Sequence, residues 1–274
     1  LGKGSYQDNK ISKAAFLRAK DCLLEFKDIS DSYKAPIKKA FATAVVRDSS
    51  NGEDFKKVMK EKTGITIQTL SGNNEAELIM KGVMSAFTAF KYPVVIMDIG
   101  GGSTEFVFVK DQKMVWRKSF SIGASRLLQE FDPSDPVSKK DVKKLIDFLN
   151  EELSELKDRF SETPFSLIGS SGSFETFADM IALEINKDSQ KPMEPSVELN
   201  SLELYQLFEQ LIHSSREERL KMSGLPLYRV DTIVLSGLMT QWFIEEFQPE
   251  NIWTSYRSMK EGVIVEVINN KENN

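Results

Sequence analysis

The chain has 274 residues, of which 41% are apolar and 28% charged, proportions typical of a globular protein with one large domain or two lobes. Its formal net charge of −5 argues against a nucleic-acid partner, which would require a basic face. The single cysteine excludes a disulfide framework. Because no run reaches the roughly 20 apolar residues of a membrane span and no signal peptide opens the chain, we expect a cytoplasmic protein without a membrane partner.

The first 90 residues alternate between helical and extended patterns. Apolar periodicity and turn residues predict five elements, namely a helix over 11–29, a strand over 37–46 ending at Arg47-Asp48, a helix over 51–64, a strand over 65–70 and a helix over 71–87. The order in this part of the chain is therefore α-β-α-β-α.

The remaining residues begin with three short strands and continue with alternating helices and strands. The predicted elements are strands over 94–97, 105–109 and 114–120, a long helix over 142–160, a strand over 165–168, a helix over 174–183, a polar connection over 186–200, a strand over 231–235 followed by a helix, a strand over 251–256 and a helix over 258–268. Three antiparallel strands followed by crossover units predict a mixed β-sheet with helices on its faces, an α/β fold.

The two halves share the same order of elements, except that the first lacks the opening three-strand meander. We infer two related lobes. Lobe I covers residues 1–72, with the C-terminal helix 259–274 packing back on it, and lobe II covers 73–258.

The stretch 98–105, DIGGGSTE, is the strongest candidate for chemistry. A dinucleotide-binding or Walker loop would lead into a helix, whereas here a strand follows and no lysine comes after the glycines. Three glycines leave bare amides that suit close approach of an anion. We therefore predict a phosphate-binding loop made of Gly100, Gly101, Gly102, Ser103 and Thr104. Asp98 and Glu105 would hold Mg²⁺, because acids beside a phosphate need a cation.

Two further loops offer amides to an anion in the same way. Gly169-Ser170-Ser171-Gly172-Ser173 lies between a predicted strand and a helix, so it would present amides at a helix N-terminus. Ser236-Gly237, in VLSGLM, would form a third strand–loop–helix. Loops at the carboxyl ends of strands in one lobe would line one face of a cleft.

Taken together, these stretches resemble the exopolyphosphatase / guanosine pentaphosphate phosphohydrolase (Ppx/GppA) phosphatase family of the actin–sugar-kinase–heat-shock superfold. The resemblance covers nearly the whole chain, through LGKG, ATAVVRDSSNGEDF, GITIQTLSGNNEAELIMKGV, VVIMDIGGGSTEFVF, SIGASRL, LIGSSGS, GLPLYRVDTIVLSG and SMKEGVI. The combination of SGxxEA with a following DIGGGSTE is specific, since actins and sugar kinases share the glycine loop but not the pair.

The resemblance implies roles for individual residues. Glu75, the acid before alanine in SGxxEA, would be the base that activates the attacking water. Asp98 and Glu105 would be metal or phosphate-site residues, and Arg47 would meet a phosphoryl group as a bidentate guanidinium. From the residues alone, Glu75 would be an exposed charge on a helix's first turn, and Arg47 would pair with Asp48.

The chain departs from the family pattern in three places. Asn74 replaces the first acid of SGxEEA. Ser171 replaces a glycine of the usual GTGGT loop, so Gly169, Ser171 and Gly172 would form an altered phosphate-binding loop. Nothing before Leu1 supplies the family's first strand–loop–strand meander, so we expect the natural chain to extend further at its N-terminus.

The sequence thus predicts a Mg²⁺-dependent hydrolase that releases terminal phosphate from inorganic polyphosphate or guanosine pentaphosphate in a cleft between the lobes. The alternatives are a non-hydrolysing sensor of guanosine tetraphosphate or polyphosphate and an actin-like kinase. The family often dimerises, and a homodimer is possible.

Overall fold

The computed structural model describes residues 1–2, 5–6, 8–160, 164–187 and 190–272. The chain divides into two compact units, Leu1–Glu75 and Ala76–Asn274. In the described residues, no helix is long and apolar enough to cross a membrane.

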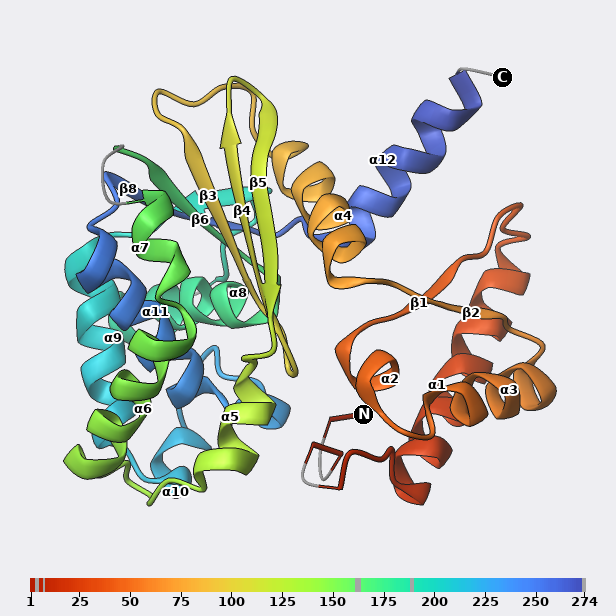
Figure 1. The fold of residues 1–274 in the computed structure, drawn as a ribbon, viewed down its shortest axis with the longest axis horizontal. Helices are drawn as coiled ribbons and strands as arrows, with labels where there is room; N and C mark the ends of the chain where they lie inside the picture. Colours follow the sequence, from red (N-terminus) through yellow and green to blue (C-terminus); the bar gives the residue numbers. More distant parts are fainter. Residues whose placement is uncertain (3–4, 7, 161–163, 188–189, 273–274) are drawn as a thin grey trace. The chain divides into compact units, whose positions relative to one another are not determined.

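The first unit is a small α/β unit with a two-stranded parallel sheet (Figure 1). Its elements are α1 (Lys13–Ser32), β1 (Ala40–Ala42), α2 (Ala44–Asp48), α3 (Gly52–Thr63) and β2 (Ile67–Thr69). Its core joins α1 to α3, where the rings of Phe16 and Phe55 meet edge to face with centroids 5.0 Å apart.

The predicted strand over 37–46 is wrong beyond Ala42. The chain leaves β1 at Thr43 and turns into the short helix α2, which carries Arg47. A run of β-branched residues is read as a strand from propensity, but here Ala44 and Val46 are buried on a helix. Arg47 therefore projects from a helical turn and does not follow a strand.

The second unit contains a six-stranded mixed sheet in the order β5-β4-β3-β6-β8-β7 (Figure 1). The strands are β3 (Val94–Ile99), β4 (Thr104–Lys110), β5 (Lys113–Phe120), β6 (Ser166–Ser170), β7 (Ser196–Glu198) and β8 (Asn251–Ser255). The predicted meander is β3-β4-β5, and β6 and β8 continue the sheet in parallel. The expected mixed α/β sheet is confirmed, with an antiparallel edge strand, β7, inside the stretch predicted as a polar connection.

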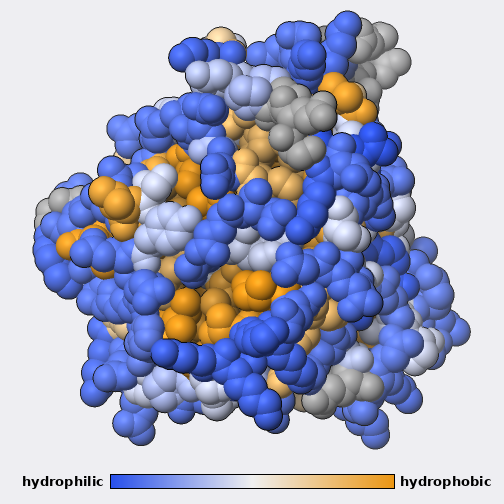
Figure 2. Space-filling model, turned by 60° about the vertical axis from the view of Figure 1, so that its left-hand side comes forward, coloured by the Kyte–Doolittle hydropathy of each residue, from blue (hydrophilic) through white to orange (hydrophobic). Residues whose placement is uncertain are grey.

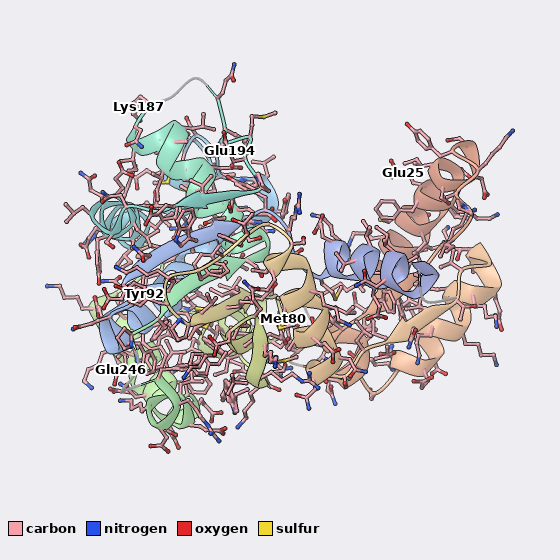
Figure 3. The ribbon with its side chains drawn as sticks, turned by 90° about the horizontal axis from the view of Figure 1, so that it is seen from above. Glu25, Met80, Tyr92, Lys187, Glu194 and Glu246 are labelled. Carbon is pink, nitrogen blue, oxygen red and sulfur yellow. The ribbon has the colours of Figure 1, made fainter. Side chains whose placement is uncertain are left out.

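The two faces of this sheet have different coverings. Val95 and Met97 point into a large helical layer, whereas Val94 and Ile96 face α4 (Gly72–Met84), where Met80 is labelled in Figure 3. The helical layer consists of α5 (Ala124–Phe131), α6 (Lys139–Glu152), α7 (Glu155–Phe160), α8 (Ser171–Met180), a π-helical turn (Ile181–Ile185), α9 (Ser201–His213), α10 (Arg216–Arg219), a 3₁₀ turn (Leu227–Arg229) and α11 (Ile233–Phe247).

Two sequence predictions fail in the helical layer. The long helix expected over 142–160 is broken into α6 and α7 at Leu153 and Ser154. The strand expected over 231–235 is the beginning of α11. Because α11 is buried on nearly all sides, its sequence lacks amphipathic periodicity, and its Ile-Val-Leu start resembles a buried strand. Ser236 and Gly237 therefore lie inside a helix, and the third anion-binding loop does not exist.

The C-terminal helix α12 (Met259–Glu272) belongs to the second unit, where it crosses α4. The crossing is built on glycine. A Cβ on Gly82 would lie 1.8 Å from the Ser258 carbonyl oxygen, and one on Gly262 would lie 1.8 Å from that of Leu78. The Lys81 ammonium bridges the two helices by pairing with Glu266 at 2.9 Å. The helix thus packs on α4 within the second unit, and its packing on lobe I stays a prediction. The first compact unit ends at Glu75, whereas lobe I was predicted to end at residue 72.

Candidate functional site

A row of four polar residues crosses the sheet of the second unit on the face that α4 covers. The register pairs Glu105 of β4 with Ser119 of β5 on one side and with Asp98 of β3 on the other. Asp98 in turn pairs with Ser170 of β6. Register partners in neighbouring strands point to the same face. The Ser119 hydroxyl donates to Glu105 Oε1 at 2.6 Å, and the Ser170 hydroxyl donates to Asp98 Oδ2 at 2.6 Å. The two predicted acids therefore form one site.

Both carboxylates of this row are buried, with Asp98 6% and Glu105 1% exposed. Burial raises the pKa of Asp98 to about 6, against the hydrogen bonds from Ser170 and Ser171 and the charge of Arg229, which lower it. Like charges directly opposite each other on neighbouring strands are destabilising. The pair would therefore gain from a cation.

The pair fits Mg²⁺ by its chemistry. Mg²⁺ is commonly held by one or two carboxylates together with substrate phosphate oxygens and water. Asp98 and Glu105 supply two such carboxylates. Within the described residues, no group of three or more Asp, Glu, His or Cys side chains gathers as a complete metal cage. The donor set thus suits an ion that is shared with a phosphate ligand.

The glycine loop joins β3 to β4, and its carbonyls are held by the first turn of α5. The Ala124 amide donates to the Gly100 carbonyl at 3.0 Å, and the Ser125 amide donates to that of Gly101 at 2.9 Å. The Arg126 Nε donates to the Gly102 carbonyl at 3.0 Å. Among the described residues, none accepts a hydrogen bond from the amides of Gly101 and Gly102. The loop therefore offers amides to a ligand while its carbonyls are bound.

The backbone of the glycine loop lies close to Gly123 and to its own Ser103. None of them adopts the left-handed conformation, which among the described glycines occurs at Gly64 and Gly224. The loop instead lies directly on Gly123, where a Cβ would sit 2.5 Å from the Gly101 carbonyl carbon. A Cβ on Gly100 would lie 3.0 Å from the Ser103 carbonyl oxygen. A side chain at Gly123 would push the loop away from the segment that leads into α5.

The two hydroxyl residues of the loop are buried. The Thr104 hydroxyl donates to the Ile122 carbonyl and its side chain is fully enclosed, so in this structure it ties the loop to the segment before α5. Ser103 is also buried, and its carbonyl accepts from the Gly100 amide at 2.9 Å. Thr104 is thus placed to hold the loop, and phosphate binding by its hydroxyl stays a prediction.

The second loop connects β6 to α8, and its glycines make room for neighbouring side chains. A Cβ on Gly169 would fall 1.9 Å from the Phe174 ring, and one on Gly172 would fall 1.4 Å from an Arg229 guanidinium nitrogen. Ser171 adopts the left-handed conformation with φ 67°. The serine thus takes a conformation that favours glycine, the residue that the family pattern has at this position.

Arg229 is a residue of this site that sequence reasoning missed. It ends the 3₁₀ turn Leu227–Arg229, and its guanidinium lies on Gly172 and over the Tyr228 ring, 5.2 Å from the centroid. Burial raises the pKa of Glu175, and the positive charge of Arg229 partly offsets this rise. The GLPLYRVD stretch contains the residue, but no spacing in it indicated where the side chain would point.

Arg47 and Glu75 meet within the first unit. The Arg47 Nη1 lies 3.3 Å from Glu75 Oε2 and 3.2 Å from the Leu70 carbonyl oxygen, while Nε donates to Asp48 at 3.1 Å. Glu75 is 8% exposed and lies in the first turn of α4. The ion pair with Asp48 exists, as the residues alone predicted, but the same guanidinium also orients the predicted base.

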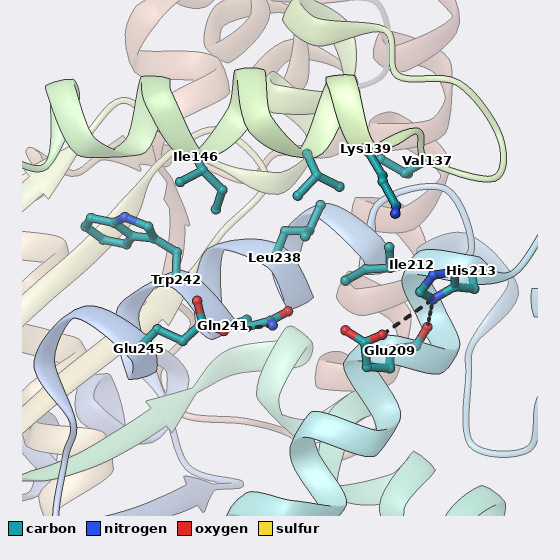
Figure 4. Close-up of a pocket in the computed structure, with 11 residues that line it drawn as sticks. Val137, Lys139, Ile146, Glu209, Ile212, His213, Leu238, Gln241, Trp242 and Glu245 are labelled. Atoms are coloured by element: carbon teal, nitrogen blue, oxygen red, sulfur yellow. Dashed lines mark hydrogen bonds and ion pairs between the residues drawn. The ribbon is translucent and has the colours of Figure 1, made fainter.

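A separate cavity of about 550 Å³ lies in the helical layer between α6, α9 and α11. Ile146, Ile212, Leu238 and Trp242 line it, and a Glu209–His213 ion pair stands beside it (Figure 4). Figure 2 shows hollowed apolar patches between hydrophilic side chains on one face of the molecule. None of the predicted site residues lines this cavity.

Comparisons with known proteins identify the family of this chain. The family model of the Ppx/GppA phosphatase family matches residues 1–271. A bifunctional 3-dehydroquinate synthase/phosphatase of Fusobacterium nucleatum is 30% identical over 99% of this chain, which spans 41% of that relative's length. Exopolyphosphatase 1 of Mycobacterium leprae is 26% identical over 93% of this chain and 75% of its own.

Solved structures show the same fold. The crystal structure of an exopolyphosphatase from Cytophaga hutchinsonii aligns with a TM-score of 0.94 and 31% identity, covering 98% of this chain and 87% of that chain. A Ppx/GppA family member from Aquifex aeolicus aligns with a TM-score of 0.80 and 26% identity, covering all of this chain and 87% of the other. The mixed α/β fold expected from the sequence is confirmed, and the chain belongs to the Ppx/GppA phosphatase family.

Proposed function

We propose that this protein is a phosphoanhydride hydrolase that releases terminal phosphate from inorganic polyphosphate. The observation that carries the proposal is the buried Asp98–Glu105 pair beside a loop whose Gly101 and Gly102 amides are unbonded in the described structure. Amides and a metal-binding carboxylate pair together suit a polyanionic ligand. The relatives named exopolyphosphatase in Mycobacterium leprae and Cytophaga hutchinsonii support the substrate class.

Glu75 is proposed as the general base. The Arg47 guanidinium 3.3 Å away holds its carboxylate in one orientation. A carboxylate so oriented can take a proton from a water molecule as that water attacks the terminal phosphorus in line with the leaving phosphate. The proton passes to a Glu75 Oε. The bond between the terminal phosphorus and the bridging oxygen breaks, and the shortened polyphosphate leaves with that oxygen.

The remaining groups would stabilise the charge that develops on the transferring phosphoryl group. The Gly101 and Gly102 amides would donate to its oxygens, and the Arg229 guanidinium is the nearby cation of the second loop. When bound, Mg²⁺ at Asp98 and Glu105 would neutralise phosphate charge.

Guanosine pentaphosphate is proposed as a second substrate, because its terminal anhydride presents the same bond to the same groups. The non-hydrolysing sensor and the actin-like kinase remain the competing proposals. Ser171 adopts a backbone conformation that glycine favours, so its substitution for glycine is not by itself an argument for the sensor.

The test is phosphate release with Mg²⁺ from polyphosphate and, separately, from guanosine pentaphosphate. The variant Glu75→Gln should lose about a hundredfold to ten-thousandfold in kcat, since it cannot accept the proton. Glu53→Gln is the matched control, because Glu53 is also in the first turn of a helix but is fully exposed.

Equal turnover by Glu75→Gln and wild type would remove Glu75 from this role. Tight binding of either substrate without phosphate release would favour the sensor, and ADP formation that depends on an acceptor would favour the kinase.

A further inference from the structure

Ser171 has an unusual backbone conformation for its surroundings. Eight described residues other than glycine have positive φ, and seven of them, such as Asp111 and Gln248, are exposed at turns or helix ends. Ser171 alone among these eight is partly buried, with φ 67° at the start of α8. A residue with a Cβ is strained in this region, and such strain persists where the surroundings enforce it.

Ser170, in the same loop, does not cap its own helix. It occupies the N-cap position of α8, where a serine hydroxyl usually accepts from a helix amide, but its side chain makes no capping hydrogen bond. The hydroxyl donates instead to Asp98 Oδ2 at 2.6 Å. The Ser171 side chain also lies close enough to Asp98 to lower the pKa of that carboxyl.

Both departures converge on one carboxylate. Asp98 is buried, the Ser170 hydroxyl donates to it, and the adjacent Ser171 side chain lies close enough to lower its pKa. Neighbouring hydroxyls limit the rotation of a carboxylate, so its remaining lone pairs keep fixed directions toward another ligand. The loop geometry is thus explained by Asp98 and not by the anion-binding role predicted for Ser171.

We propose that Ser170 and Ser171 are positioning residues that hold the Asp98 carboxylate, at the expense of a helix cap and of a relaxed backbone. The proposal rests on the proposed function of Asp98 as a carboxylate of the phosphate and metal site. Ser171 then acts through Asp98 and does not touch phosphate.

The backbone part of the proposal is tested without substrate or metal, by comparing Ser171→Gly with Ser171→Ala. Both variants lose the hydroxyl, but only alanine keeps the Cβ in the left-handed region. Ser171→Ala should therefore melt roughly 2–4 °C below Ser171→Gly. Equal melting temperatures would overturn the argument that this conformation is strained.

The positioning part is tested by kinetics. Ser171→Gly and Ser171→Ala should lose about tenfold to a hundredfold in kcat, with little change in KM, because a charge-assisted hydrogen bond to Asp98 is lost. Ser171→Thr restores the hydroxyl and should recover most of kcat while melting below wild type. The rise in melting temperature on adding Mg²⁺ should also shrink in the glycine and alanine variants.

Asp98→Asn separates failure of this proposal from failure of the proposed function. Wild-type turnover by Asp98→Asn would contradict the proposed function of Asp98. The comparison of the Ser171→Gly and Ser171→Ala melting temperatures would still test whether the Ser171 backbone is strained. If Asp98→Asn is impaired but Ser171→Gly has full turnover, Ser171 does not position Asp98. In the double variant, Ser171→Gly should add no further loss of kcat to that of Asp98→Asn.

Discussion

At the scale of single residues, the buried Asp98 carboxylate destabilises the fold when it is ionised. Burial raises its pKa from 3.8 to about 6, so the native state binds a proton that the unfolded state has released between these values. The associated stability is fully present below about pH 4 and is lost as the pH rises through about 6. Above that pH the ionised carboxylate has to stay buried.

Asp98→Asn should therefore stabilise the metal-free protein at pH 8 by about 1–3 kcal/mol while it lowers kcat for phosphate release. The gain should diminish towards pH 4, where wild-type Asp98 is protonated. Urea unfolding in a metal chelator at pH 5 and pH 8 measures both values.

Asp141→Asn is the control of opposite sign. The hydroxyls of Ser138 and Ser134 lower the pKa of Asp141 to about 2, so its carboxylate stabilises the native state at neutral pH. Removing that charge should lower stability at pH 8. A stabilising effect of Asp141→Asn, or a pH-independent effect of Asp98→Asn, would contradict the linkage argument.

The predicted acids of the second unit come together for a reason that is visible in the sequence. Asp98 and Glu105 flank a hairpin tip, and hairpin register places such flanking residues opposite each other. Ser119 and Ser170 join the same row only because β5 and β6 add to the two edges of the hairpin. Arg229 comes from a turn 131 residues beyond Asp98, and only folding brings it there.

At the scale of elements, the crossing of α4 and α12 fixes the helix whose first turn carries Glu75. Gly82 and Gly262 allow the two backbones to touch, and Lys81 bridges to Glu266. Glu77 of the same helix accepts from the Arg117 guanidinium of β5 at 3.1 Å. The helix α4 is thus held by a second helix and by the sheet.

Gly82→Ala should destabilise the protein by about 2–3 kcal/mol, because its Cβ would lie 1.8 Å from the Ser258 carbonyl oxygen and the helices would have to separate. Gly237→Ala in α11 is the matched control, since the nearest atom there is a Phe208 ring carbon at 3.2 Å. That change should stay within about 1 kcal/mol of wild type, helped by helix propensity. Equal effects of the two substitutions in denaturant unfolding would show that the crossing tolerates separation.

At the scale of the whole molecule, the hydrophobic cores are divided unequally. Both large clusters, on the two faces of the six-stranded sheet, consist of residues from Ala76 onward. The first unit has one small cluster around Phe55 and Met59. Because stability follows the apolar surface that a unit buries, the second unit should fold without the first.

A fragment of residues 71–274, which keeps α4 whole, should unfold cooperatively in urea with a free energy of about 5 kcal/mol or more. It should release no phosphate, because it lacks Arg47. A fragment with helical far-ultraviolet signal but no fixed aromatic signal would show that the second unit depends on the first for its packing.

The sequence by itself determined the class of fold, the three-strand meander, the family and the location of the acids. Each of these depends on local patterns such as strand alternation, turn glycines and short motifs, which act over a few residues. Tertiary structure alone decided that residues 231–235 are helical, that 142–160 is broken, and that Ser170, Ser171 and Arg229 surround Asp98. The physical reason is burial. A segment enclosed on all sides loses the periodicity that marks a helix, and a buried carboxylate takes its partners from elements far away in the chain.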